Sequence, residues 1–262
     1  SEMPIPRKLL LPLSSAALLV ACATSPLGRS QLKLYPDSDL NEMGVTAFAQ
    51  TSKEVPVTSN GQTTAYVNCI ANAITREVGG VWEVKVFESK EVNAFALPGG
   101  KIGVYTGLLK VTQTQDQLAA VIGHEVAHVI AGHSNERVSQ QQVAGLGMGV
   151  AQVILGGGPG GGAVMSALGA GAQYGVLLPF SRAHESEADL LGLDYMARAG
   201  FDPRQAVQLW RNMAQAGGQK PPEFASSHPS DDTRIRQIEA RLPQDLPVFE
   251  QSQAAGKRPK CG

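Results

Sequence analysis

A His-Glu-x-x-His motif inside an apolar, helix-periodic stretch constrains this chain more than any other feature of its sequence. The motif is His124-Glu125-Val126-Ala127-His128, and residues 115–123 lead into it with apolar side chains at helical spacing. Residues four apart lie on one helix face, so both imidazoles can reach one metal ion while Glu125 lies beside it. The pattern predicts a buried helix, capped by Thr114 or Asp116, that holds zinc. The alternative is a helix that carries two surface histidines by chance.

A catalytic zinc ion commonly has three protein ligands and one open position for water, so a third ligand is needed. A longer motif with a glycine and a third histidine fails, because Ala131 and Ser134 occupy those two positions. The segment 181–189 is the other candidate, since Glu185 and Asp189 are four apart and share a helix face. Glu185 can then bind zinc while Asp189 accepts a hydrogen bond from a ligating imidazole. The alternative is a solvated acidic helix start, which the helix dipole favours.

Three ordered motifs carry a family resemblance. They are residues 93–108 (Asn-Ala-Phe-Ala-Leu-Pro-Gly-Gly-Lys-Ile-Gly-Val-Tyr-Thr-Gly-Leu), the His-Glu-x-x-His motif, and residues 185–189 (Glu-Ser-Glu-Ala-Asp). Together they resemble the HtpX and CAAX-prenyl-protease family of gluzincin zinc metallopeptidases, from about Thr63 to Leu242. The resemblance implies one Zn²⁺ per chain, with Glu187 not a ligand. The ligands that it implies are His124, His128 and Glu185, with Asp189 behind them.

The segment from His228 to Arg234 also matches a motif of this family, in which the histidine and the arginine face the active site. Arg234 is the candidate for stabilising the tetrahedral oxyanion, and the alternative is a surface helix residue. Three roles stay open for His228. It can displace the catalytic water and keep an enzyme latent, contact the substrate or transition state, or form a plain helix-capping loop. His133 is expected to be structural.

The N-terminus has the pattern of a targeting sequence. Arg7 and Lys8 precede an apolar run, 9–21, that is too short to span a bilayer but suits a signal peptide. Residues 19–22 (Leu-Val-Ala-Cys) resemble a bacterial lipobox, which predicts lipidation of Cys22 and a lipid anchor in the bacterial periplasm. Ala23 after the cysteine favours the outer membrane. The alternative is a plain secretory peptide. Residues 1–2 precede the expected initiator methionine and look like a cloning remnant.

Cys69 and Cys261 form an even pair once Cys22 carries lipid, and an oxidising compartment permits a disulfide between them. Such a bond would tie the C-terminal tail to an early helix. The alternative is a buried Cys69 and an unpaired Cys261 in the tail. The sequence does not decide between these two arrangements.

The pattern of elements predicts an α+β, mainly α, fold with a small three-stranded sheet and the zinc helix, and the resemblance implies that this fold is of the gluzincin type. Helices are expected near 39–51 and 62–77, and strands at 82–88, 93–96 and 101–105, in an antiparallel or mixed sheet. We expect a signal peptide at 1–21, a tether at 22–36, a single metallopeptidase domain at 37–250 and a tail at 251–262. The glycine-rich segment 156–162 separates stretches 138–155 and 163–178. These two stretches are expected as a mobile helical hairpin over the cleft, or as helices that simply pack on the core.

One strand has a predicted use beyond packing. A peptide substrate can add to an exposed sheet edge through backbone hydrogen bonds, which demand little of its sequence. Asn93, Ala94 and Phe95 resemble the substrate-binding edge of related gluzincins, and the small Ala94 would let another backbone approach. An ordinary half-buried strand with Phe95 in the core is compatible with this role.

These observations predict a zinc-dependent endopeptidase in which Glu125 activates the zinc-bound water. The expected substrates are unfolded or misassembled envelope proteins, with the outer-membrane assembly machinery as a further partner. The alternative is a periplasmic chaperone or assembly factor with latent or no proteolysis. A net charge of −1 gives no basic stripe, so nucleic acid is not expected as a partner.

Overall fold

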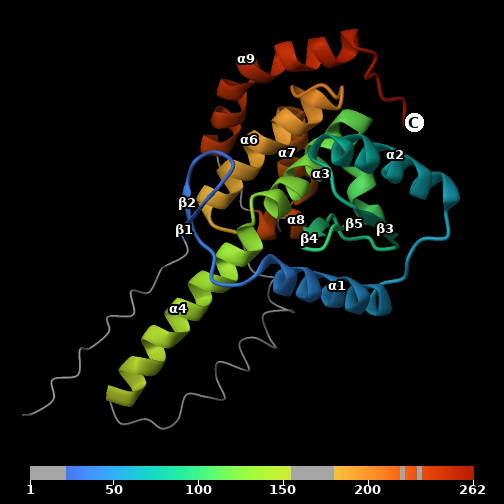
Figure 1. Ribbon diagram of the computed structural model, residues 1–262. Coiled ribbons are helices and arrows are strands. Elements are labelled where there is room, and N and C mark those ends of the chain that lie inside the picture. The colour runs from blue at the N-terminus through green and yellow to red at the C-terminus, as the bar shows by residue number, and fades with distance from the viewer. Residues whose placement is uncertain (1–21, 155–179, 219–221, 229–231) are drawn as a thin grey trace, which may run out of the picture.

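The computed structural model describes residues 22–154, 180–218, 222–228 and 232–262, which form a mainly helical α+β fold with a small sheet (Figure 1). This is the predicted fold class. The predicted signal sequence, the glycine-rich segment and the second half of the expected helical hairpin lie outside the described residues. The helices are α1 (Asp37–Glu54), α2 (Gly61–Val78), η1 (Thr106–Lys110), α3 (Gln115–Ile130), α4 (His133–Ile154), α6 (Arg182–Arg198), α7 (Gln205–Ala216), α8 (Glu223–Ser227) and α9 (Asp232–Ala254).

The main sheet is mixed, with β5 (Lys101–Tyr105) at its centre. β3 (Glu83–Phe87) pairs with β5 in parallel, and β4 (Ala94–Leu97) pairs with it antiparallel, which leaves one long side of β4 free. The β4–β5 turn, residues 98–100, needs a glycine at its last position. Gly100 has a φ of +70°, and a Cβ there would lie 2.1 Å from the Val81 carbonyl oxygen.

α3 runs through the centre of the molecule and carries the His-Glu-x-x-His motif (Figure 1). Thr114 caps its N-terminus by accepting a hydrogen bond from Gln117 N at 3.2 Å. The helix packs against α2, α6, α7 and β4. Its apolar side chains join the main hydrophobic core, so the motif is presented from a rigid and largely buried element.

Two glycines let α3 and α6 approach each other closely. A Cβ on Gly123 would lie 2.9 Å from Gly192 O, and a Cβ on Gly192 would lie 2.8 Å from His124 N. Any larger residue would push the two helices apart, because these obstacles are backbone atoms. The glycine pair therefore sets the distance between the histidines of α3 and the acidic start of α6.

The segment predicted as a tether contains a hairpin, in which β1 (Cys22–Thr24) pairs antiparallel with β2 (Ser30–Leu32). Figure 1 shows the hairpin beside α6 and the start of α4. At the other end of the chain, Cys69 of α2 and Cys261 are joined by a disulfide with Cα atoms 5.5 Å apart. The tail also bonds to α3, since Cys261 N donates to Gln115 Oε1. Within the part of the chain that the structure describes, no helix is long and apolar enough to cross a bilayer.

Candidate metal centre

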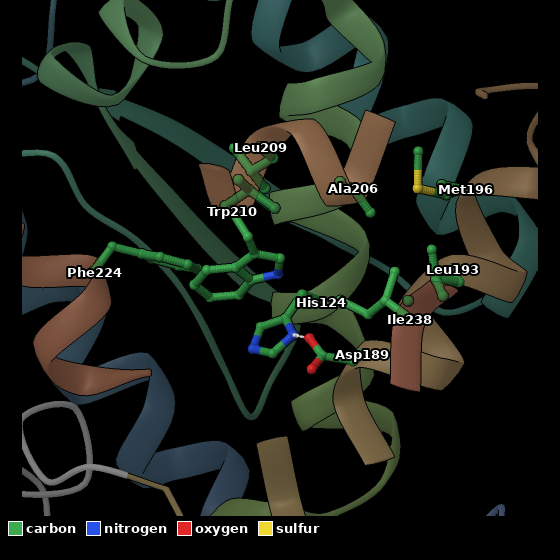
Figure 2. Close-up of a pocket in the computed structure, with 12 residues that line it drawn as sticks. His124, Asp189, Leu193, Met196, Ala206, Leu209, Trp210, Phe224 and Ile238 are labelled. Atoms are coloured by element: carbon green, nitrogen blue, oxygen red, sulfur yellow. Dashed lines mark hydrogen bonds and ion pairs between the residues drawn. The ribbon is translucent and has the colours of Figure 1, made fainter. Parts of the chain in front are cut away.

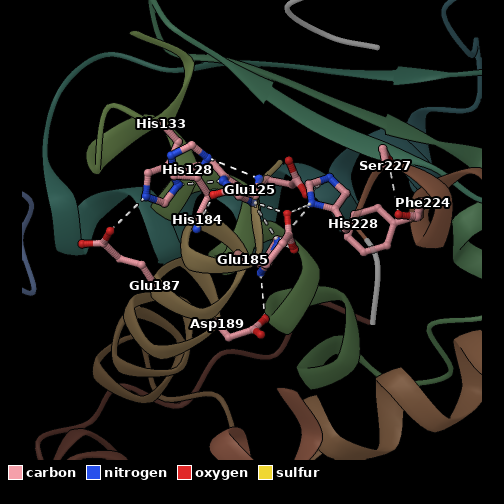
Figure 3. Close-up of polar contacts among 12 residues, drawn as sticks. Glu125, His128, His133, His184, Glu185, Glu187, Asp189, Phe224, Ser227 and His228 are labelled. Carbon is pink, nitrogen blue, oxygen red and sulfur yellow. Dashed lines mark hydrogen bonds and ion pairs between the residues drawn. The ribbon is translucent and has the colours of Figure 1, made fainter. Parts of the chain in front are cut away.

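Four side chains from three places in the fold meet at one spot: His124 and His128 from α3, Glu185 from α6, and His228 after α8. Figure 3 shows His128, Glu185 and His228 of this group. One donor atom from each lies within 4.8 Å of the others, and all four residues are buried. His124 Nε2 is 3.0 Å from His128 Nε2 and 3.2 Å from Glu185 Oε2. His228 Nδ1 is 2.9 Å from Glu185 Oε1 and 3.2 Å from His124 Nε2.

These separations fit a zinc ion. Tetrahedral zinc with bonds of about 2.0 to 2.1 Å to nitrogen and oxygen places its donor atoms about 3.3 Å apart. The donor set is also typical of zinc, with imidazoles and one carboxylate in a dry site. His124, His128 and Glu185 therefore meet where the sequence predicted them to meet, and His228 completes a four-donor set.

The charge balance of the site favours a cation. Burial alone would lower the pKa of His124, but the carboxylates of Glu185 and Asp189 raise it to about 10. Burial would raise the pKa of Glu185, but the charges of His228 and His124 hold it well below its usual range. A divalent ion would take the place of these protons and leave the imidazoles neutral.

Asp189 and Arg234 hold His124 from behind. His124 Nδ1 donates to Asp189 Oδ1 at 3.0 Å, and Arg234 grips the same carboxylate through Nε at 2.7 Å and Nη2 at 2.8 Å. Arg234 Nη1 also lies 3.0 Å from Glu185 Oε2. Its guanidinium therefore faces Glu185 of the donor cluster and Asp189 behind His124, and these contacts hold both acids in place. The oxyanion contact expected from the sequence stays a prediction.

Aromatic side chains enclose the imidazoles. Phe180 stacks on His128 with ring centroids 3.9 Å apart, and Phe224 stacks on His228 at 4.5 Å. Trp210 and Asp189 lie on different sides of His124 (Figure 2), next to a cavity of about 10 Å³. A space of this size holds at most one water molecule, so the back of the site is closed.

Glu125 lies between the metal cluster and the sheet. Its Oε2 accepts a hydrogen bond from Ala96 N at 3.3 Å, and its Oε1 is 3.2 Å from His228 Nε2. Burial raises the pKa of Glu125, while the charges of His228 and His124 lower it in part. A carboxylate with a raised pKa beside a metal site is suited to accept and return a proton.

The predicted substrate strand is largely buried, but its backbone faces the site at alternate residues. Tyr105 N donates to Asn93 O, so residues 93, 95 and 97 are the ones that bond to β5. The backbone N–H and C=O groups of Ala94 and Ala96 therefore point away from β5. Asn93 Oδ1 accepts from Ala94 N at 2.9 Å. Phe95 points the other way, into an aromatic cluster with Phe48, Phe87 and Tyr105. The strand register thus adds Ala96, which the sequence analysis did not single out.

A larger cavity of about 280 Å³ adjoins His128 and the end of β4. It lies between α1 and the start of α4, and its walls mix apolar and polar side chains. Leu40, Asn41, Pro98, Ile130 and Asn135 are among them. The sequence had no signal for this cavity, because its walls come from segments about 100 residues apart that carry no shared motif.

A buried helix with a His-Glu-x-x-His motif, a ligand glutamate on a second helix and an aspartate behind the first histidine defines a gluzincin-type zinc metallopeptidase. The chain belongs to Peptidase family M48, whose model matches residues 58–242. Members of this family use zinc. The match shows the family and does not specify the HtpX and CAAX-prenyl-protease branch that the motifs resemble.

Several curated relatives are similar to this chain. The mitochondrial metalloendopeptidase OMA1 of Schizosaccharomyces pombe is 41% identical over 188 residues, which is 70% of this chain and 54% of that protein. Human metalloendopeptidase OMA1 is 31% identical over 93% of this chain and 51% of its own length. The Beta-barrel assembly-enhancing protease of Escherichia coli is 25% identical over 80% of this chain and 45% of its length. The chain thus spans about half the length of these relatives.

Proposed function

We propose that this chain is a zinc-dependent endopeptidase that cleaves misfolded or misassembled proteins of the bacterial envelope. The observation that carries the proposal is the position of Glu125, between the metal-binding cluster and the free side of β4. That is where a general base must lie to act on a water next to a peptide bond held along the strand.

The chain's own residues account for each chemical task. Zinc bound by His124, His128 and Glu185 would supply a water of lowered pKa and polarise the scissile carbonyl. Glu125 accepts a proton from that water and passes it to the leaving amine. The hydrogen bond from Ala96 N holds the Glu125 carboxylate in place for both transfers.

An extended substrate would lie along β4. The backbone groups of Ala94 and Ala96 point away from β5. Their carbonyl oxygens can accept hydrogen bonds from a peptide without reading its sequence, while Ala96 N stays bonded to Glu125 and Ala94 N to Asn93. Past the end of the strand, the cavity beside Pro98 and His128 has room for a substrate side chain. This arrangement suits unfolded chains, because a folded protein offers few extended segments.

We infer that the described state is latent. With a metal ion bound, His228 would be a fourth donor beside His124, His128 and Glu185 and would leave no open position for a catalytic water. Activity then depends on withdrawal of His228 from the cluster. Its place after the short helix α8, outside the α3–α6 pair, makes such a movement compatible with an intact ligand set.

The location and the substrates rest on the sequence and on the names of relatives. A lipid on Cys22 would anchor the enzyme to the outer membrane from the periplasmic side. The name of the Escherichia coli relative, Beta-barrel assembly-enhancing protease, suits this location and a role beside the outer-membrane assembly machinery. We propose an envelope location for this chain, in contrast to the mitochondrial location that the names of the OMA1 relatives give for those proteins. Within the family, we propose the HtpX and CAAX-prenyl-protease-like branch that its motifs resemble.

A cleavage assay with unfolded casein tests the activity. The zinc-loaded chain should cut casein, a chelator should abolish cleavage, and added zinc should restore it. Glu125→Gln is the matched control, because it keeps every ligand. Binding of unfolded casein without any cleavage, also in His228→Ala, would favour a chaperone or assembly factor that uses the same cleft.

A further inference from the structure

The N-terminal hairpin docks on the back of the metal centre through one arginine. Arg29 lies just before β2, outside the region 58–242 that the family model matches. Its guanidinium binds Glu136 of α4 through Nη1 at 2.5 Å and Nη2 at 2.7 Å. It binds Glu187 of α6 through Nε at 3.1 Å and Nη2 at 3.0 Å. Both carboxylates are buried, with side chains 4% exposed.

Glu187 passes this contact on to a zinc-binding histidine. Its Oε2, the atom that Arg29 binds, is 3.2 Å from His133 Nε2. The other ring nitrogen of His133, Nδ1, is 2.8 Å from His128 Nδ1 (Figure 3). His133 is fully buried, so no solvent competes for these bonds. An unbroken path of polar contacts therefore joins Arg29 to His128.

One arrangement of protons satisfies the whole path. His128 Nε2 faces the metal cluster, so its Nδ1 carries the proton and donates it to His133 Nδ1. His133 then carries its own proton on Nε2 and donates to Glu187, whose charge Arg29 balances. Each partner fixes the ring orientation and tautomer of the next.

The path mirrors the support of the other zinc-binding histidine. His124 donates to Asp189, which Arg234 of α9 holds by two bonds. In both cases an arginine fixes a buried carboxylate that supports the Nδ1–H group of a histidine. Asp189 accepts from His124 directly, and Glu187 is linked to His128 through the ring of His133. Arg234 comes from the C-terminal part of the chain, and Arg29 comes from the N-terminal hairpin.

We propose that Arg29 is a positioning residue of the metal centre, which orients His128 through Glu187 and His133. The hairpin is then a component of the zinc site. Outer partners of metal-binding histidines typically change metal affinity by about 10- to 100-fold when removed. Loss of Arg29 should lower the metal affinity by a similar factor, although two residues, Glu187 and His133, stand between Arg29 and His128.

Zinc release to an excess of chelator tests this proposal on the full chain without any measurement of activity. Arg29→Ala and Glu187→Ala should each release zinc at least about 10-fold faster, and the double variant should be no faster than the singles, because both break one path. Arg29→Lys should recover only part of the loss, since an ammonium lacks the fork that spans two carboxylates. Release at the wild-type rate in Arg29→Ala would overturn the proposal.

Ser139→Ala is the matched control. Ser139 Oγ of α4 accepts from Leu34 N at 2.9 Å, so its loss loosens the same N-terminal segment without touching the path. Equal acceleration of zinc release in Ser139→Ala would show general loosening and overturn the proposal. A second measurement needs no variant: nitrogen shifts of the histidine rings in the zinc-loaded protein should show His133 protonated at Nε2. Protonation of His133 at Nδ1 instead would break the path and also overturn it.

Discussion

His228 Nε2 lies 3.2 Å from Glu125 Oε1, while His228 Nδ1 lies 2.9 Å from Glu185 Oε1. One imidazole therefore contacts both the proposed general base and a proposed metal ligand. Under the proposed mechanism, a substrate and a water molecule would need the space that this ring fills, so His228 would have to move before cleavage.

His228→Ala should speed peptide cleavage while zinc is retained, because three ligands stay and the water position opens. Turnover of an unfolded substrate and zinc content should be measured on the same samples. Ser227→Ala is the neighbouring control, since the bonds that the Ser227 hydroxyl makes with described residues go to carbonyl oxygens within α8. Slower cleavage with full zinc would instead assign His228 to the transition state, and unchanged kinetics would leave it a structural role.

Glu125→Gln should keep zinc and lose at least about 100-fold in turnover, since the amide cannot accept the proton and no ligand is removed. Metal content by elemental analysis and turnover should be determined together. Activity within a factor of about ten of wild type would reject Glu125 as the general base.

The zinc helix shows which parts of the site can be predicted from neighbouring residues in the sequence. Its period, its cap and the spacing of His124 and His128 are all properties of neighbouring residues, and Glu185 with Asp189 is a second local pattern. The three strands also followed from alternation and turn residues, whereas the choice between an antiparallel and a mixed sheet came from the structure. Each of these features is set by interactions within about 20 residues.

The remaining parts of the site depend on contacts between distant segments. Arg29 meets Glu187 across 158 residues, and no periodicity marks either residue as a partner of the other. The hairpin was expected as a tether for this reason, because its polar side chains looked solvated. Phe180 likewise gave no signal before the structure stacked it on His128. Arg234 lies in a segment that matches a family motif, but only the structure showed that it binds Asp189 and Glu185.

Glu185→Ala should lose most bound zinc even with zinc in slight excess, because it removes one of three ligands. Glu187→Ala should stay close to one zinc per chain under the same conditions. Glu187 lies outside the donor cluster, and the loss of a supporting contact leaves the affinity high enough to fill the site. Elemental analysis after gel filtration measures both. Equal zinc loss in the two variants would reject the ligand assignment.

Cys22→Ala should release the protein from membranes and leave peptidase turnover unchanged, if a lipid on this residue is the anchor. Fractionation of cells that express the chain with its N-terminal segment measures the distribution between membrane and soluble fractions. A variant that still sediments with membranes would point to another attachment.

Asp245→Asn should make unfolding less dependent on pH. Burial raises the pKa of Asp245 from 3.8 to about 6, and Arg241 lowers it only in part. The folded state therefore binds this proton more tightly than the unfolded state, so the contribution of Asp245 to stability is largest below about pH 4 and is lost as the pH rises through 6. The neutral asparagine avoids the cost of a buried charge. We expect it to stabilise the chain by about 1 kcal/mol at pH 8, less than the full shift because water screens the carboxylate, and by nothing at pH 4. Urea unfolding of the metal-free, disulfide-intact protein at the two pH values measures this difference, and an equal effect at both would show that Asp245 does not titrate in this window.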